Sequence, residues 1–213
     1  MTSRPRLIET MRVEAGGTMP LLDGHIARLQ ASCAALAYAT PDIKALRREL
    51  SHRVRSLDPA QTWRLRLLVA EDGSWSLDQG PLATSPDPLA VVVTGPRRSG
   101  DEAWLCHKTT RRPWYEDAAR WLADHPDIFD VLYWNDEGLM CEGSRSNLYM
   151  QADDGTWLTP PLGAGLLPGV QRAALLQAGL VREHAFTREA FLEARARRIS
   201  NALRGWRDVV IAA

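Results

Sequence analysis

The chain has 213 residues, and its 26 basic and 26 acidic side chains leave no net formal charge. That length fits one large domain or two small ones. Neutrality argues against a dedicated nucleic-acid binder, which normally carries a basic excess. The longest apolar runs, such as residues 89–93, are far too short to span a bilayer. We therefore expect a globular protein that acts on small molecules and binds neither nucleic acid nor membrane.

The beginning of the chain and its cysteines bear on the compartment. Met-Thr-Ser-Arg-Pro-Arg is not followed by the apolar segment of a signal peptide. Cys33, Cys106 and Cys141 are too few and too scattered for a disulfide framework or a metal site. We expect a reduced, cytoplasmic protein without a bound metal.

The first part of the chain predicts an α/β subdomain. Residues 6–13 alternate as a strand does, and Asp23 is placed to cap a helix that runs to about Tyr38. A second helix follows Pro41-Asp42. Strands are expected at 63–70, 74–78 and 89–94, and Glu-Asp-Gly-Ser joins the first two of them as a hairpin.

Residues 95–101 are the best candidate for a linker because they are rich in Gly, Arg and Ser. Beyond them the pattern predicts helices at about 113–124 and 169–178. Strands are expected at 129–134, 139–142, 146–151, 156–159, 196–202 and 207–212. The sequence thus predicts an α+β fold, with an N-terminal subdomain over 1–98 and a larger, β-rich subdomain over 99–213 that contains Lys108.

Lysine is rare in this chain, since only Lys44 and Lys108 are lysines among the 26 basic residues. Arginine keeps its proton, whereas a lysine amine can lose its proton and attack a carbonyl. Lys44 lies in an ordinary surface-helix context. Lys108 lies in Cys-His-Lys-Thr-Thr-Arg-Arg (106–112), where neighbouring cations lower the proton affinity of an amine. Lys108 is a candidate imine-forming lysine, and a solvated basic turn is the alternative.

A phosphate site is suggested by Leu-Leu-Pro-Gly-Val-Gln-Arg (166–172). Pro followed by Gly at the start of a helix leaves backbone N–H groups that point along the helix axis, and the helix dipole favours an anion there. The amides of Gly169, Val170 and Gln171 are the candidate donors. The alternative is an ordinary loop-to-helix junction, which would have the same sequence pattern.

Three further positions could contact the same ligand. Glu142 ends an apolar strand before a Gly turn, so a buried carboxylate there needs a partner, which could be an arginine or a pyridinium nitrogen. Arg28 could bind phosphate through two nitrogens or be a surface helix residue. Asn201 and Ala202 end a strand in small residues that could supply more phosphate donors or form a turn.

The order of these motifs resembles the class IV (fold type IV) pyridoxal-phosphate aminotransferases and lyases. Glu-Gly-Ser-Arg-Ser-Asn-Leu (142–148) and Leu-Thr-Pro-Pro-Leu…Leu-Leu-Pro-Gly-Val are the specific parts, and the resemblance covers nearly the whole chain. Within the family the likeness is greatest to the aminodeoxychorismate lyases. It is carried by Leu-Ile-Glu-Thr-Met-Arg-Val (7–13), Leu-Asp-Gly-His-Ile-Ala-Arg-Leu-Gln-Ala-Ser (22–32) and Asn-Ala-Leu-Arg-Gly-Trp (201–206).

The resemblance implies a role for each candidate residue. Lys108 would form the Schiff base with pyridoxal 5'-phosphate, and Glu142 would pair with its pyridine nitrogen. Thr10 matches a threonine that helps proton movement in the lyases. The phosphate would be held by groups of both subdomains, with the cofactor in the cleft between them; these are Arg28, Gly169, Val170, Gln171, Asn201 and Ala202.

The resemblance also implies an activity and partners. The leading function is conversion of 4-amino-4-deoxychorismate to 4-aminobenzoate and pyruvate in folate biosynthesis, by a homodimer that could dock an aminodeoxychorismate synthase. The alternatives are a class IV aminotransferase of the branched-chain or D-amino acid type, and a degenerate member without catalysis. Relatives have an N-terminal strand and an Asp-Arg-Gly…Gly-Asp-Gly loop before Glu-Thr-Met-Arg, whereas this sequence begins almost at that point.

Overall fold

The computed structural model describes residues 4–96 and 102–212, and the chain divides into two compact units. The N-terminal unit comprises the chain up to Thr84 together with His107–Arg111, and the C-terminal unit comprises Ser85–Cys106 and the chain from Arg112 onward. This division differs from the predicted boundary at residue 98. Strand β4 (Leu89–Val93) belongs to the C-terminal unit because it pairs in parallel with β5 and β11, and Lys108 belongs to the N-terminal unit.

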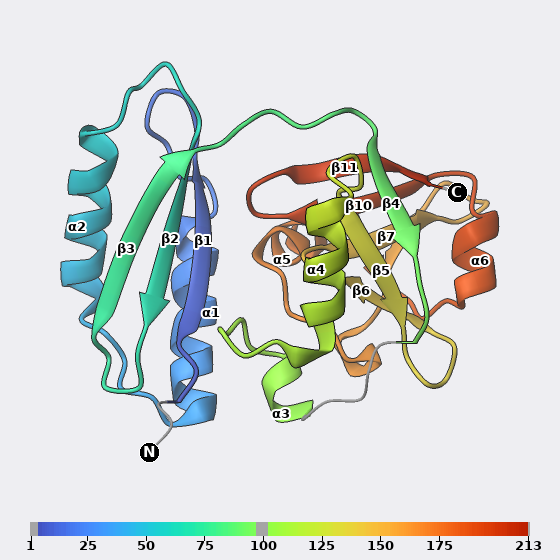
Figure 1. Ribbon diagram of the computed structural model, residues 1–213, viewed down its shortest axis with the longest axis horizontal. Coiled ribbons are helices and arrows are strands. Elements are labelled where there is room, and N and C mark those ends of the chain that lie inside the picture. Colours follow the sequence, from blue (N-terminus) through green and yellow to red (C-terminus); the bar gives the residue numbers. More distant parts are fainter. Residues whose placement is uncertain (1–3, 97–101, 213) are drawn as a thin grey trace. The chain divides into compact units, whose positions relative to one another are not determined.

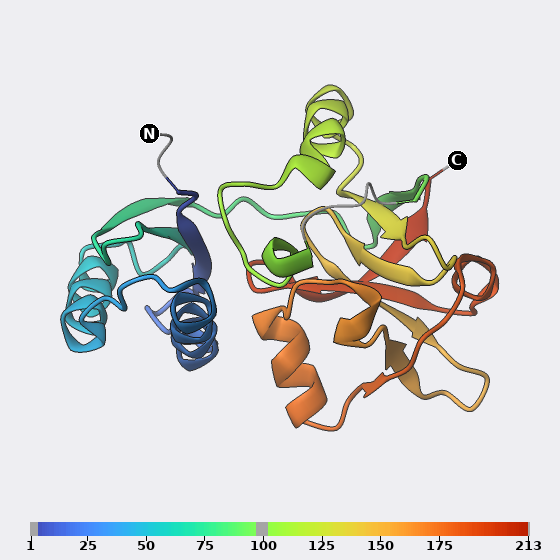
Figure 2. The same ribbon diagram turned by 90° about the horizontal axis from the view of Figure 1, so that it is seen from below.

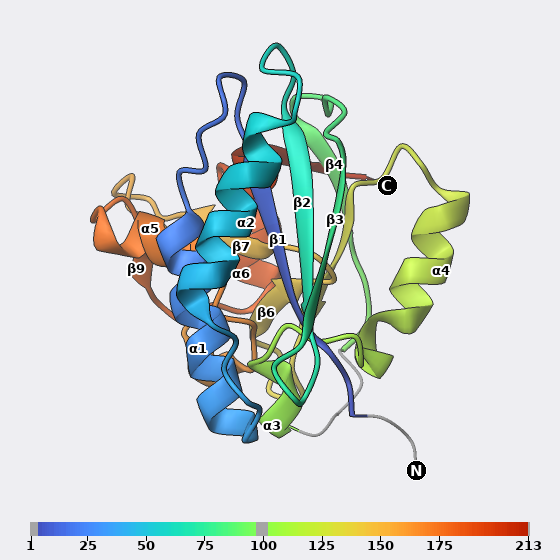
Figure 3. The same ribbon diagram turned by 90° about the vertical axis from the view of Figure 1, so that its left-hand side faces the viewer.

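A three-stranded antiparallel sheet forms the N-terminal unit, in the order β1-β2-β3. Helices α1 and α2 cover one face of it (Figures 1 and 3). The predicted strands, helices and hairpin of this unit are confirmed. The elements are β1 (Leu7–Val13), α1 (Leu22–Leu36), α2 (Ile43–Arg55), β2 (Trp63–Val69) and β3 (Trp75–Pro81).

The predicted cap of α1 is wrong. The helix begins at Leu22, so Asp23 lies inside its first turn, where it does not cap the helix. The Asp23 carboxylate instead accepts a hydrogen bond from Arg47 of α2 at 2.6 Å. The negative charge of Asp23 in the first turn still stabilises the helix through its dipole.

The two faces of this sheet differ in chemistry because side chains alternate along each strand. Leu7, Met11 and Val13 of β1 and Leu65, Leu67 and Val69 of β2 belong to the core under the helices. The cross-strand pairs Ile8↔Leu68, Thr10↔Arg66 and Arg12↔Arg64 therefore lie on the opposite face, which we call the open face.

Residues 107–111 join this sheet beside β1. Thr109 pairs with Leu7 in an antiparallel bridge, and the Ile8 amide donates to the Lys108 carbonyl at 2.7 Å. The Thr110 amide donates to the Arg6 carbonyl at 2.9 Å. Sequence patterning did not predict this pairing, because it joins positions about a hundred residues apart.

The C-terminal unit contains an eight-stranded sheet in the order β6-β5-β4-β11-β10-β7-β8-β9. Helices α4 and α5 lie on opposite sides of its strands (Figure 2). The predicted strands and both predicted helices are confirmed. In this unit the elements with predicted counterparts are β4, α4 (Glu116–Asp124), β5 (Asp130–Trp134), β6 (Met140–Gly143), β7 (Asn147–Gln151), β8 (Trp157–Thr159), α5 (Val170–Gln177), β10 (Arg197–Asn201) and β11 (Gly205–Ile211).

Short elements complete this unit. The first turn of the helix predicted at about 113–124 is η1 (Pro113–Tyr115), and patterning did not predict α3 (Glu102–Leu105), η2 (Leu162–Ala164), β9 (Arg182–Glu183) and α6 (Arg188–Glu193). Of the predicted linker, residues 97–101 lie outside the described residues. Among the helices that the structure describes, none has the length and apolar character needed to cross a membrane.

Candidate active site

The backbone geometry around Lys108 decides where its side chain points. Paired residues in an antiparallel bridge project to the same side of a sheet, so Thr109 shares the helix-covered face with Leu7 and is fully buried. Neighbouring residues in an extended segment project to opposite sides. Lys108 is therefore on the open face, across from Ile8 and on the same side as Thr10. The structure brings two of the predicted catalytic residues onto one surface.

Arg66 shares this surface, and sequence reasoning did not single it out. It lies directly across from Thr10 in the β1–β2 register. On the same face Arg12 pairs with Glu14 at 2.9 Å and Arg64 pairs with Asp78 at 2.8 Å. Arg66 has no ion-pair partner among residues 4–96 and 102–212. The strand alternation of Trp-Arg-Leu-Arg-Leu was the signal that could have placed two arginines on one face.

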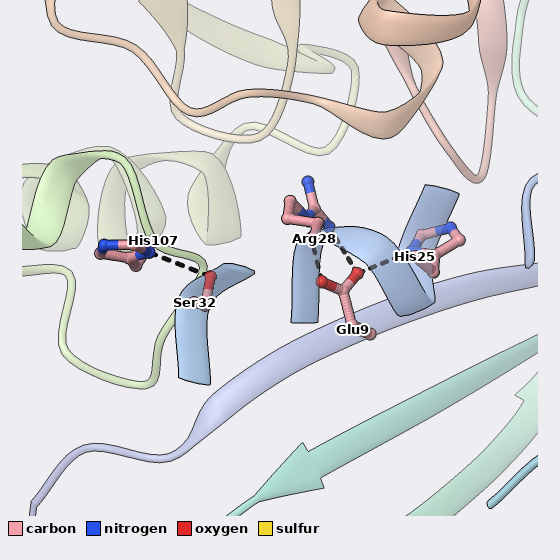
Figure 4. Close-up of polar contacts among 5 residues, drawn as sticks. All are labelled: Glu9, His25, Arg28, Ser32 and His107. Atoms are coloured by element: carbon pink, nitrogen blue, oxygen red, sulfur yellow. Dashed lines mark hydrogen bonds and ion pairs between the residues drawn. The ribbon is translucent and has the colours of Figure 1, made fainter. Parts of the chain in front are cut away.

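Arg28 is held by Glu9 of β1. Its Nε donates to Glu9 Oε1 at 2.9 Å, and an NH2 group donates to Oε2 at 2.6 Å. Figure 4 shows the remaining terminal nitrogen of Arg28 turned away from Glu9. Such a paired geometry fixes the plane of the guanidinium, so only that third nitrogen is directed elsewhere.

His25 completes this buried cluster from one turn earlier in α1. Its Nδ1 lies 2.6 Å from Glu9 Oε2 (Figure 4). Burial opposes ionisation of Glu9, but the charge of Arg28 and the hydrogen bonds from His25 and Arg28 outweigh it and lower the pKa of the Glu9 carboxyl below its ordinary value. An ionised carboxylate only accepts, so Nδ1 of His25 carries the hydrogen of this bond.

A second contact ties the Lys108 segment to α1. His107 Nδ1 lies 2.9 Å from the hydroxyl of Ser32 (Figure 4). Burial lowers the pKa of His107, so its ring favours the neutral form. The residue before Lys108 is thereby anchored to the helix, and the residues after it are anchored to β1.

Glu142 is buried at the end of β6 in the C-terminal unit. Its Oε1 accepts a hydrogen bond from the Tyr115 hydroxyl at 2.6 Å, and its Oε2 accepts one from the Leu167 amide at 3.0 Å. A carboxylate has about four lone-pair sites, so these two bonds orient it and leave it able to accept another hydrogen bond.

The predicted phosphate seat is the start of α5. Gly169 is the N-cap residue, and no side chain caps the helix. The first amides of a helix have no acceptor within the helix, so an anion can take them. Arg172, another arginine near this seat, donates instead to the Pro160 carbonyl at 2.7 Å and pairs with Glu183.

A buried aspartate, which sequence reasoning missed, shapes the turn after Glu142. Asp130 is fully buried and accepts hydrogen bonds from the hydroxyls of Ser144 and Ser146. Burial raises the pKa of Asp130, against the opposing effect of those bonds. A β-carbon at Gly143 would overlap the Asp130 carboxylate, so glycine is required there.

Asn201 has a local structural role. Its side-chain oxygen accepts from the amides of Leu203 and Arg204 at 3.1 and 2.9 Å, and its side-chain nitrogen donates to the Arg145 carbonyl at 3.2 Å. These bonds shape the β10–β11 turn. The backbone amide of Ala202 is then the group of this pair that could contact a phosphate.

Each unit contains groups that match the chemistry of pyridoxal phosphate. The C-terminal unit holds an oriented carboxylate and an uncapped helix start. The N-terminal unit holds an amine and an arginine fixed by a carboxylate. Within the part of the chain that the structure describes, no three His, Cys, Asp or Glu side chains gather as a metal site would need.

Comparison with known proteins agrees with this chemistry. The family model for amino-transferase class IV matches residues 6–211. A Schizosaccharomyces pombe protein named "Putative aminodeoxychorismate lyase" is 29% identical over 170 residues, 78% of this chain and 72% of that protein.

Two solved structures are also similar. A "Putative amino-acid aminotransferase" from Mesorhizobium loti is 31% identical, with a TM-score of 0.86, over 98% of this chain and 100% of its own. A "Putative 4-amino-4-deoxychorismate lyase" is 26% identical, with a TM-score of 0.79, over 96% of this chain and 83% of its own.

The fold and the donor set define a pyridoxal-phosphate enzyme of the fold type IV class. More particularly, the chain belongs to the class IV aminotransferase family, which includes aminotransferases and lyases that use pyridoxal phosphate. The predicted family, fold class and cofactor are thus confirmed. The roles of the individual residues stay predictions.

We predict that Glu9→Gln makes stability less dependent on acid pH. Glu9 has a lower pKa in the folded protein than in the unfolded chain, so its contribution is complete above about pH 4.3 and is lost as the pH falls through the lower folded value. The parent should lose stability over this window more steeply than the variant. At pH 7 the variant should lose about 3–5 kcal/mol, because the half-buried Arg28 guanidinium loses the charged carboxylate of Glu9 that faces it.

Urea unfolding followed by circular dichroism between pH 7 and 3.5 measures both effects. Asp23→Asn is the control, since Asp23 is 90% exposed where it pairs with Arg47, and its loss should be less than about 1 kcal/mol. Equal acid slopes for the parent and Glu9→Gln would contradict the prediction.

Proposed function

We propose that this chain is a pyridoxal-phosphate-dependent 4-amino-4-deoxychorismate lyase, which releases 4-aminobenzoate and pyruvate. The observation that carries the proposal is the placement of Lys108 and Thr10 on the open face of one sheet. The name of the fission-yeast relative supports the lyase reaction.

Lys108 and Thr10 move the proton in this proposal. When bound, pyridoxal phosphate supplies an aldehyde carbon that amines attack and an electron-withdrawing ring. With the cofactor bound, the Nζ atom of Lys108 would remove the hydrogen from the ring carbon that carries the substrate amine, and the bond between the neighbouring ring carbon and the enolpyruvyl oxygen would break. The proton then passes to the leaving enolpyruvyl group, with the Thr10 hydroxyl as a donor and acceptor between them. The ring becomes aromatic, and the released enol becomes pyruvate.

Glu142 sets the electronic state of the ring. Its carboxylate, held by the Tyr115 hydroxyl and the Leu167 amide, accepts a hydrogen bond from the pyridine nitrogen and keeps that nitrogen protonated. Because both holding bonds come from the same unit, the carboxylate is oriented before the cofactor binds. This preorganisation lowers the cost of stabilising the charge that develops during reaction.

The phosphate is held by donors that the sequence already suggested. We assign it to the third nitrogen of Arg28, the amides of Gly169, Val170 and Gln171, and the amide of Ala202. Glu9 orients Arg28, so the guanidinium does not have to be ordered when phosphate binds.

Arg66 is proposed to bind a carboxylate of the substrate. 4-Amino-4-deoxychorismate is a dicarboxylate, and arginine recognises carboxylates through two parallel hydrogen bonds. Arg66 lies directly across from Thr10, on the same face as Lys108. The β-carbons of Arg66 and Thr10 are about 5 Å apart, as in any directly opposed pair.

Transamination of an amino acid is the second candidate, and the name and 31% identity of the Mesorhizobium loti structure favour it. It requires the same lysine, carboxylate and phosphate seat. The third alternative, a member without catalysis, does not agree with the enzyme family to which the chain belongs. From the family resemblance we also propose a cytoplasmic homodimer that works in folate biosynthesis and docks an aminodeoxychorismate synthase.

Pyruvate release distinguishes the candidate reactions. Purified protein reconstituted with pyridoxal phosphate should release pyruvate from 4-amino-4-deoxychorismate without an added 2-oxo acid, as a coupled lactate dehydrogenase assay would show. Activity that depends strictly on a 2-oxo acid, with a new amino acid as product, would establish the aminotransferase instead. A Lys108→Ala protein is the blank for both assays.

Borohydride reduction should place the pyridoxyl group on Lys108. Lysine is the only side chain that forms a stable reduced adduct with the cofactor aldehyde, and the chain offers only Lys44 and Lys108. Peptide mapping by mass spectrometry reads the position. Lys44→Arg should label as the parent does, whereas adduct on Lys44 in the parent would remove the basis of the assignment.

Arg66→Ala should raise KM for the substrate by about 10- to 100-fold, since a lost hydrogen bond to a charged group costs about 1.5–3 kcal/mol. Affinity for pyridoxal phosphate should stay the same because Arg66 is not assigned to the cofactor. Arg47→Ala, on the surface of α2, is the matched control. An unchanged KM in Arg66→Ala would exclude the carboxylate contact.

A further inference from the structure

In the C-terminal unit, both backbone polar groups of Leu167 form hydrogen bonds with side chains. The Leu167 amide donates to Glu142 Oε2 at 3.0 Å, and the Leu167 carbonyl accepts from Asn147 Nδ2 at 3.0 Å. Leu167 lies two residues before Gly169, the N-cap of α5. The loop that leads into the phosphate seat is therefore tied to the carboxylate through one side and to Asn147 through the other.

Asn147 also lies against the helix start itself. A β-carbon at Gly169 would overlap the Asn147 side-chain oxygen, so the backbone of Gly169 and the amide of Asn147 are in direct contact. Asn147 is 4% exposed. Glycine is required here because a larger residue would not fit beside Asn147. The backbone angles of Gly169 (φ −66°, ψ 136°) are ones that any residue can adopt.

The turn between Glu142 and Asn147 is itself fixed. Ser144 and Ser146 donate to the buried Asp130, and Gly143 packs on that carboxylate. A rigid turn thus has Glu142 at one end and Asn147 at the other, and both side chains form hydrogen bonds with the backbone of Leu167.

We infer that Asn147 is a positioning residue that sets the first amides of α5 at a fixed separation from Glu142. Pyridoxal phosphate is a rigid ring with its nitrogen and its phosphate on different sides, so one molecule can use both groups only if their spacing is correct. The inference rests on the proposed function, which assigns those two groups to the cofactor. Asn147 touches the loop and the helix start, and it acts on the phosphate through them.

The test compares pyridoxal phosphate with pyridoxal, which lacks the phosphate. Asn147→Ala should raise the Kd for pyridoxal phosphate by about tenfold, the equivalent of one lost hydrogen bond in the seat, and raise the Kd for pyridoxal by less than about threefold. Imine absorbance titrations measure both. A purely structural role would weaken the two ligands equally and leave their Kd ratio unchanged, which would overturn the inference.

Asn135→Ala is the matched control. Asn135 is also an asparagine of the C-terminal unit, and its side-chain oxygen accepts from the amides of Glu137 and Leu139 in the β5–β6 turn. Both Kd values should stay at the parent level in this variant. Asn147→Asp serves if Asn147→Ala does not fold, because it keeps the shape but loses the donor to Leu167, and the same change in ratio is expected.

A double variant tests the contact directly. Gly169→Ala should weaken pyridoxal phosphate binding, because its methyl group meets the Asn147 oxygen. In the Asn147→Ala background that oxygen is absent, so adding Gly169→Ala should change the Kd by less than about threefold. If the two substitutions instead raise the Kd for pyridoxal phosphate independently, so that their fold-changes multiply in the double variant, the contact does not position the phosphate seat.

The outcomes separate this inference from the proposed function. A parent protein that fails to bind pyridoxal phosphate would overturn both. A parent that binds it through Lys108, combined with an unchanged Kd ratio in Asn147→Ala and Asn147→Asp, would overturn the positioning role alone.

Discussion

Two backbone hydrogen bonds, from the Ile8 amide to the Lys108 carbonyl and from the Thr110 amide to the Arg6 carbonyl, determine on which face of the sheet Lys108 lies. They pair Thr109 with Leu7, and strand alternation then turns Lys108 toward the open face with Thr10 and Arg66. A shift of one residue in this register would place Lys108 under the helices, where a charged amine would need a partner. The face of the sheet on which Lys108 lies therefore follows from this backbone pairing.

A buried carboxyl group in each unit orients residues that we propose to contact the cofactor. Glu9 holds Arg28 from within the core of the N-terminal unit, and Asp130 holds the turn between Glu142 and Asn147 in the C-terminal unit. Neither arrangement is an efficient way to gain stability, because removing charges from water offsets much of their attraction. Their value is geometric, since each fixes the direction of a polar group before a ligand arrives.

The sequence predicted most strands and helices correctly because their patterning is local. It could not assign β4 to the C-terminal unit or Lys108 to the N-terminal one, since both depend on pairing between distant segments. Strand-end and Pro-Gly signals located the end of β6 near Glu142 and the start of α5, and their roles in binding stay predictions. Arg66 and Asp130 were missed because an arginine in a strand and an aspartate before an apolar run have no distinctive local pattern. The Glu9–Arg28 pair was missed because it joins a strand to a helix across the core.

The lyase and the aminotransferase need the same groups to hold the cofactor, so Glu142, Asn147 and the start of α5 do not favour one reaction over the other. In both proposed reactions Lys108 would remove a proton from the carbon beside the substrate nitrogen. They differ in where that proton goes and in whether the substrate carries a group that can leave. The choice therefore lies with the residues that read the rest of the substrate. On the open face the proposed residues are Thr10, which would pass a proton onward, and Arg66, which lies across from it and would bind a carboxylate. Substitutions on this face should change the preference between substrates, whereas substitutions in the phosphate seat should change affinity for the cofactor in either reaction.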